Sequence, residues 1–180
     1  MINDYKLNDA LRSLNDSVRK VMRESDDAAA STSAKSSLVG QMNRILSDGY
    51  FFYFKAHMFH WNVTGANFPQ YHEFFGKVYE QVFGNLDPIA EQIRALGVMA
   101  PVSLQQMSTM TSIVPSSGIP SAEQMFGILI DDNKKIIAGL TAGYKLAESA
   151  GEPGLSNFLQ DLIDKHKKLA WMLESTAKGE

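Results

Sequence analysis

The chain contains no cysteine among its 180 residues. Disulfide bonds, thiolate nucleophiles, iron–sulfur clusters and soft-metal thiolate sites are therefore excluded, and a metal ion would have to be bound through nitrogen and oxygen ligands. Long hydrophobic runs are missing as well: no apolar segment follows a basic start, and nowhere do about eighteen apolar residues run together. We therefore predict neither a signal peptide nor a membrane span, and a cytoplasmic protein is the default expectation.

A strong excess of charge of either sign is also lacking. The 17 basic and 20 acidic residues give a net charge of −3 and are spread along the chain. Up to Lys35, six basic residues are balanced by six acidic ones, so charge does not support DNA binding by the N-terminal part. With 44% hydrophobic residues, the chain can build one domain with a substantial core.

Residues 68–96 carry the clearest helical pattern, because apolar residues recur there at spacings of three and four. Pro88 interrupts this segment, and Asp87-Pro88 could be the N-cap and first turn of a separate helix. The apolar register nevertheless passes through Pro88 without slipping. We predict one helix with a kink.

Further helical patterns cover residues 38–60, 104–110, 121–150 and the segment after Pro153, with a capping box at Ser121 and Gln124. Two long helix pairs joined by one long crossover predict an all-α, ferritin-like four-helix bundle with a short helix in the crossover. From Tyr50 to Trp61 nearly every residue is apolar or aromatic. A helix that is apolar on all sides indicates a subunit interface.

The N-terminal part is predicted to be an extension of the bundle, with residues 1–36 separate from a domain at 37–180. Its apolar residues predict a short amphipathic helix: Leu7, Leu11, Leu14, Val18 and Val21. The segment from Ala28 to Ser37, almost wholly Ala, Ser and Thr, is typical of a flexible linker.

Two histidines and two carboxylates form the candidate metal site: His60, His72, Asp87 and Glu91. Asp87 and Glu91 lie one helical turn apart and could hold one ion together. Fifteen residues at 1.5 Å each place His72 roughly 22 Å from Asp87, too far for a shared metal within one chain. Two antiparallel copies related by a two-fold axis would bring the histidines of one chain to the carboxylates of the other.

For several of these residues a purely structural role is also open. A lone His60 on an apolar stripe could be a hydrogen-bonded core residue, and Asp87 could be no more than a helix cap. His57, one turn before His60, could support the site from outside the ligand set or have a structural role, as could Trp61. His166 falls on the core-facing stripe of the last helix and is expected to be structural.

Taken together, these motifs resemble the Dps family of miniferritins, the DNA-protecting proteins of starved cells. The similarity extends over residues 38 to 175 and rests on four segments: His57-x-x-His60-Trp61-Asn62-Val63-x-Gly65, Phe68-x-x-Tyr71-His72, Asp87-x-Ile89-Ala90-Glu91-x-Ile93-x-Ala95-Leu96-Gly97 and His166-x-Lys168-x-Ala170-Trp171-Met172-Leu173.

The resemblance implies a hollow shell of twelve subunits built from two-fold dimers, which oxidises Fe²⁺ with hydrogen peroxide and stores ferric mineral. It identifies His60, His72, Asp87 and Glu91 as ferroxidase ligands shared between subunits, with Trp61 beside the metal. One departure is notable, since a carboxylate usual in the family is replaced by Gly76. Water or a neighbour such as Glu80 would have to fill that place, and activity could be reduced.

Two alternatives to the ferroxidase prediction stay open. One is a structural or DNA-associating shell whose metal centre has decayed, which the glycine at position 76 favours. The other is a zinc or manganese site that serves assembly alone, since both metals accept imidazole and carboxylate ligands.

Overall fold

The computed structural model describes residues 4–178, with the side chains of residues 12–25 and 32–178. Over this range the chain is helical and has no strands. Its helices are α1 (Asp4–Asn62), α2 (Phe68–Ala95), α3 (Leu104–Met110), α4 (Ala122–Ser149) and α5 (Pro153–Ala177). None of the described helices is long and apolar enough to cross a membrane.

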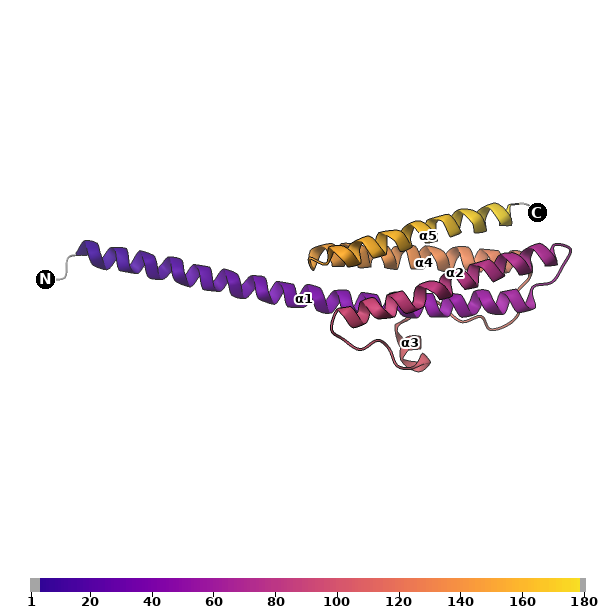
Figure 1. Cartoon of the computed structure of the whole chain (residues 1–180), viewed down its shortest axis with the longest axis horizontal. Coiled ribbons are helices and arrows are strands. Elements are labelled where there is room, and N and C mark those ends of the chain that lie inside the picture. The colour runs from indigo at the N-terminus through magenta and orange to yellow at the C-terminus, as the bar shows by residue number, and fades with distance from the viewer. Residues whose placement is uncertain (1–3, 179–180) are drawn as a thin grey trace.

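The C-terminal half of α1 packs with α2, α4 and α5 as a four-helix bundle (Figure 1). Short links connect α1 to α2 and α4 to α5, and the two helices of each pair are in contact. The long crossover between α2 and α4 carries the short α3 beside α1. The prediction of an all-α, ferritin-like bundle with a helix in its crossover is confirmed.

The helix ends follow local sequence signals. Ser121 accepts a hydrogen bond from the backbone N–H of Gln124, whose side chain accepts one from the backbone N–H of Ser121, so the predicted capping box is present. The turn between α1 and α2 contains Gly65 with φ of 117°, a conformation that favours glycine. This turn sets α1 and α2 side by side and places His60 near His72.

Pro88 lies inside α2, which runs without a break from Phe68 to Ala95. The prediction of one helix is therefore confirmed, and Asp87 does not cap a new helix. A proline here removes one hydrogen bond to the carbonyl of Gly84, and this glycine is exposed, so water can replace the missing donor. Asp87 and Glu91 consequently stay on the same helix as His72.

The predicted flexible linker at 28–37 is wrong, because α1 continues as a helix through this segment to Asn62. Alanine has the highest helix propensity, and Ser37 donates its hydroxyl to the carbonyl of Ser33 within the helix. Small side chains therefore need not interrupt a helix that begins before them and is anchored after them. The division between residues 1–36 and 37–180 stays a prediction.

The bundle interior is apolar, with a few buried polar residues, of which Asn133 and His166 bond to each other. His166 of α5 donates from Nδ1 to Asn133 Oδ1 of α4 at 2.6 Å, and Asn133 Nδ2 donates to the carbonyl of His166 at 2.9 Å. Burial, with a smaller effect of Lys165, lowers the pKa of His166 to about 4. The expected structural role of His166 fits this arrangement, since the ring is neutral and ties α4 to α5. The largest buried apolar side chains are Phe52, Phe59, Phe75, Phe126, Leu38, Met42, Ile93, Ile113, Met125, Leu129, Leu140 and Leu159.

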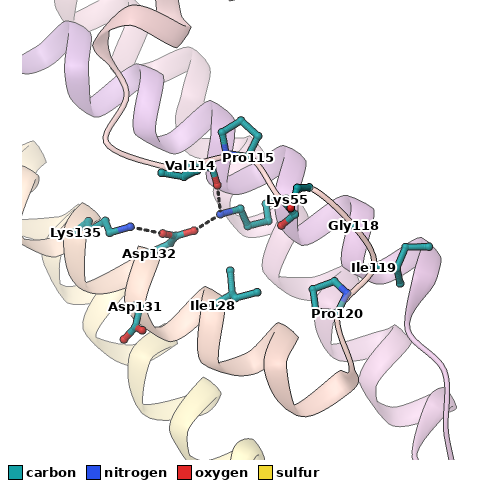
Figure 2. A pocket seen from close by; sticks show the side chains of 12 residues that line it. Lys55, Val114, Pro115, Gly118, Ile119, Pro120, Ile128, Asp131, Asp132 and Lys135 are labelled. Carbon is teal, nitrogen blue, oxygen red and sulfur yellow. Dashed lines mark hydrogen bonds and ion pairs between the residues drawn. The ribbon is translucent and has the colours of Figure 1, made fainter.

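The crossover after α3 is anchored to α1 by two buried charged residues. Asp48 accepts hydrogen bonds from the Thr111 hydroxyl at 2.8 Å and from the backbone N–H of Ser112 at 2.6 Å. Lys55 donates to the carbonyl of Val114 at 2.7 Å and forms an ion pair with Asp132. Lys55, Val114 and Asp132 line an open hollow of about 530 Å³ between the crossover and α4 (Figure 2).

Candidate metal-binding site

His60 and His72 hold each other through a reciprocal pair of hydrogen bonds. Nδ1 of His60 lies 2.7 Å from the carbonyl oxygen of His72, and Nδ1 of His72 lies 2.8 Å from the carbonyl oxygen of His60. A carbonyl can only accept, so both Nδ1 atoms carry the proton. The two rings stack with centroids 3.8 Å apart and an interplanar angle of 22°.

This arrangement fixes the tautomer that a metal needs. In a neutral imidazole with the proton on Nδ1, Nε2 keeps its lone pair, and the hydrogen bond at Nδ1 sets the orientation of the ring. In both rings the hydrogen bond at Nδ1 leaves Nε2 as the ring nitrogen that could accept a cation, and the ligand role of His60 and His72 stays a prediction.

Gly76 opens a groove beside the two rings. A Cβ atom at this position would lie 3.4 Å from both Cε1 and Nδ1 of His60, tight but free of overlap. The groove measures about 350 Å³ and is lined by residues of α2 and the end of α1: His60, His72, Glu73, Gly76, Lys77, Tyr79 and Glu80. The missing side chain at position 76 therefore leaves open space next to the candidate ligands.

The two acidic residues on the groove rim differ in their partners. Glu73 forms an ion pair with Lys77 at 2.6 Å, and the hydrogen bond and charge of Lys77 lower the pKa of Glu73. Glu80 is exposed and lies one turn after Gly76 on α2. A helical side chain leans toward the N-terminus and covers the preceding turn, so Glu80 can reach over Gly76.

His57 and Trp61 lie next to the pair, in an aromatic cluster. The ring of His57 stacks on Tyr79 with centroids 4.0 Å apart and lies 4.2 Å from the Trp61 ring system. Tyr79 in turn meets the edge of His60 at 5.3 Å. Burial, followed by the nearby His60, lowers the pKa of His57. The hydrogen bond of His57 goes to the Tyr53 hydroxyl at 3.4 Å, so support of the site by His57 and Trp61 stays a prediction.

Tyr79 was not among the residues expected from the sequence. In the sequence, Tyr79 is one of many aromatic and apolar residues of α2, and nothing marks it as part of a site. Only the packing of α1 against α2 places it between His57 and His60.

Asp87 and Glu91 are exposed on α2, two turns or more beyond the groove. Among the described side chains, no three His, Asp or Glu residues converge to hold a metal ion. One chain thus brings together the two histidines and leaves the two carboxylates elsewhere on the same helix. Their role as ligands stays a prediction, because it requires a second chain.

The surface around this region is apolar. Phe54, Trp61 and Phe83 are large and exposed on α1 and α2, and two of them lie in the segment 50–61 for which a subunit interface is predicted. Exposed aromatic groups are enriched at protein–protein interfaces, so the predicted subunit interface stays a prediction for this surface. These exposed aromatic side chains lie on α1 and α2, the same two helices that carry the candidate ligands.

Comparison with known proteins shows the family to which the chain belongs. The family model described as ferritin-like domain matches residues 39–179. The chain belongs to the ferritin-like family, and it is similar to several proteins that are named as Dps.

Two relatives show the extent of the similarity. The chain is 29% identical to the "DNA protection during starvation protein" of Brevibacillus brevis over 134 residues, which cover 74% of this chain and 90% of that protein. It is also 29% identical to an uncharacterised low temperature-induced protein of Nostoc over 145 residues, covering 79% of this chain and 81% of the relative.

Solved structures agree with this fold. The crystal structure of a Dps protein from Bacillus brevis superposes with a TM-score of 0.77 at 28% identity, covering 80% of this chain and 97% of the other. The Dps of Thermosynechococcus elongatus gives a TM-score of 0.79 at 24% identity over 82% of this chain and 94% of the other, a likeness of fold.

Proposed function

We propose that this protein is a Dps-like miniferritin of the cytoplasm, which binds Fe²⁺ as its substrate between two subunits, oxidises it with hydrogen peroxide and stores the ferric product inside a shell. Family membership supports a role in iron storage or DNA protection. The observation that carries the finer proposal is the reciprocal hydrogen bonding of His60 and His72, which leaves both Nε2 atoms available as ligands.

The remaining ligands would come from a second subunit. Asp87 and Glu91 lie one turn apart on the exposed side of α2, where antiparallel pairing of two copies brings them to the histidines of the other chain. Carboxylate and imidazole together suit Fe²⁺, and also Zn²⁺ or Mn²⁺. Each dimer would then hold two equivalent sites.

The chemistry is a two-electron reduction of peroxide. Two Fe²⁺ ions each give one electron, the O–O bond of hydrogen peroxide breaks, and two protons complete the formation of two water molecules. Because both electrons reach one peroxide molecule, no hydroxyl radical leaves the site. The role of the protein is to hold the ions through His60, His72 and the carboxylates of the partner subunit. Holding the ions together lets both electrons reach the same peroxide molecule.

The activity is tested by adding one equivalent of hydrogen peroxide to protein loaded anaerobically with Fe²⁺ and following ferric absorbance. Rapid oxidation is expected in the wild type, and His60→Ala with Glu91→Ala should abolish it. Glu73→Gln, on the same groove but paired with Lys77, is the control and should stay active. Equal rates in the double variant and the wild type would rule the proposal out. Zn²⁺ should compete with Fe²⁺ for the site.

Sharing between subunits is tested by mixing two inactive chains during assembly. One chain carries His60→Ala with His72→Ala, the other Asp87→Asn with Glu91→Gln. In a mixed dimer one of the two sites regains all four ligands, so random pairing restores about a quarter of the wild-type sites. A mixture as inactive as its parts would show that the site is not shared in this way.

A DNA-associating shell is the second candidate, favoured by the name of the Brevibacillus relative. It predicts salt-dependent retardation of DNA in gels without iron oxidation. Elemental analysis of the purified protein separates a third case, in which zinc or manganese serves assembly alone.

A further inference from the structure

The N-terminal part of α1 carries exposed apolar side chains with no partner in the bundle. This part projects beyond the other helices (Figure 1), and every side chain from Arg12 to Ser25 is exposed. Leu14, Val18, Val21 and Met22 have exposed fractions of 61%, 46%, 64% and 63%. Apolar groups in this number on one stretch of helix indicate a binding surface.

The spacing of this apolar stripe is that of a coiled coil. Leu7, Leu11, Leu14, Val18 and Val21 follow one another at intervals of four, three, four and three residues. This repeat gives heptad positions a to residues 11 and 18, and d to residues 7, 14 and 21. Valine at a and leucine at d, as at positions 18 and 14, favour two parallel strands, whereas Leu11 at a and Val21 at d have the reverse order.

The charges lie away from the stripe. In this register Arg12, Asp16, Arg19 and Arg23 occupy the b and f positions, which face water in a coiled coil, and Lys20 pairs with Glu24 at 3.9 Å. A second helix can therefore approach the stripe without meeting like charges. The narrow two-in-seven seam also differs from the broad apolar face of a helix that lies on a membrane.

A hollow on the stripe provides the complementary shape. Ser17, Val18, Val21 and Met22 surround an apolar depression of about 250 Å³ on the helix surface. In coiled coils, side chains at a and d insert into such depressions of the facing helix. The stripe thus offers both the protruding side chains and a place to receive them.

We propose that this stripe is the seam of a parallel two-stranded coiled coil with the same segment of a second copy of the chain. In the two-fold dimer of the proposed function the α2 helices run antiparallel, so the two extensions leave in opposite directions. A parallel partner must then come from a different dimer of the same assembly. The extension of α1 joins dimers to one another, an assignment that rests on the proposed two-fold seam.

A seam of about two and a half heptads is short for an isolated coiled coil, which needs three or four. Within one assembly the second helix is tethered, and tethering raises its effective concentration to the millimolar range. Since α1 runs unbroken from Asp4 to Asn62, the bundle also fixes the direction in which each extension points. These two effects make a short seam sufficient.

The absence of cysteine in the chain allows a clean cross-linking test on the full-length protein. Leu14→Cys and Val21→Cys place a thiol in the seam, where parallel pairing sets identical residues against each other at disulfide distance. Asp16→Cys and Arg23→Cys place it two residues away on the outer face. Mild oxidation should link most chains of the first two variants into disulfide dimers, with little linkage in the second two, and tenfold dilution should not change the yield.

Other results would overturn the proposal. Equal linkage at positions 14 and 16 would indicate random collision. Linkage only in a mixture of the Leu14→Cys and Val18→Cys chains would indicate antiparallel pairing, in which a d position faces an a position. A yield that falls on dilution would place the two copies in different assemblies. No linkage, together with binding to vesicles of anionic phospholipid, would assign the stripe to a membrane.

A second pair of variants, in the Leu14→Cys background, separates seam contacts from mere proximity. Val18→Glu puts a charge into the seam and should reduce linkage at least tenfold, whereas Arg19→Glu on the outer face should leave it unchanged. Equal linkage in both would overturn the coiled coil. The readout does not involve iron, and the mixed-chain experiment tests the two-fold seam separately, so either proposal can fail alone.

Discussion

The buried charges around Lys55 and the histidine pair at the end of α1 are both polar groups inside or beside a helical bundle, but their bonding differs. Lys55 bonds to the carbonyl of Val114 and to Asp132, and Asp132 also accepts from Lys135 at 2.8 Å. His60 and His72 satisfy only Nδ1 and leave Nε2 for another partner. The buried charges around Lys55 have their bonding partners within the chain, whereas Nε2 of each histidine has no hydrogen-bond partner among the described residues.

Under the proposed function, this difference separates polar groups that hold the fold from polar groups that bind metal. A buried charge is tolerated when its partners neutralise it and use its hydrogen-bonding capacity, and it then fixes the fold. A side chain that is oriented by one hydrogen bond and keeps a free lone pair is suited to bind something that the chain lacks. The variants below test this distinction, from the largest expected effect to the smallest.

Lys55→Met should be the most destabilising. Removal of the cation leaves Asp132 buried with only Lys135 beside it, and loss of one partner from a buried ion pair costs about 3 kcal/mol. The free energy of unfolding, measured by denaturant titration, should fall accordingly. The double variant Lys55→Met with Asp132→Leu should recover much of the loss, and Zn²⁺ binding by the folded protein should not change. Loss of Zn²⁺ binding in folded Lys55→Met would contradict the separation of the two groups.

Acid should weaken the bundle through His166. Because burial holds the pKa of His166 near 4 in the folded state, against about 6.5 when unfolded, the unfolded chain binds more protons between these values. Stability from this group is present above about pH 6.5 and is lost as the pH falls toward 4, by roughly 3 kcal/mol. The free energy of unfolding, measured by denaturant titration at several pH values from 7 to 4, should depend less on pH in His166→Gln than in the wild type. Parallel pH profiles of the two proteins would be inconsistent with a buried neutral His166.

Gly76→Asp should strengthen metal binding. The new carboxylate would lie against the edge of His60, where a Cβ atom fits at 3.4 Å, and one added ligand or bonding partner changes metal affinity by about tenfold. Gly76→Ala is the matched control, since it adds the Cβ without the charge. Calorimetric titration with Zn²⁺ should show tighter binding for Asp alone. If both variants bind equally, charge at this position is unimportant.

Glu80→Gln should give the smallest effect, a loss of Zn²⁺ affinity of a few fold, because an exposed carboxylate one turn from Gly76 can only partly replace a ligand at position 76. Glu73→Gln, on the same groove but tied to Lys77, should leave the affinity unchanged. The effect of Glu80→Gln should disappear in the Gly76→Asp background. Similar losses in both glutamine variants would point to general electrostatics of the groove.

Much of the fold followed from the residues themselves. The apolar spacing of three and four through Pro88 predicted one helix, the Ser121–Gln124 pair predicted where α4 begins, and both are observed. The predicted linker failed because the alanines at 28–37 favour a helix, the serines oppose it only weakly, and helix on both sides of them decided the outcome. The placement of Tyr79 against His60 needed the packing of α1 on α2, which no single helix encodes.

The sequence by itself determined the helices, the order of the bundle and the presence of imidazole and carboxylate ligands without thiolates, because these depend on spacing along one helix and on residue type. Only the tertiary structure decided which nitrogen of His60 and of His72 is free, since that depends on carbonyl groups of the neighbouring helix at 2.7 and 2.8 Å. The turn at Gly65 brings the two histidines face to face, and their mutual hydrogen bonds turn two residues of common type into a prepared pair.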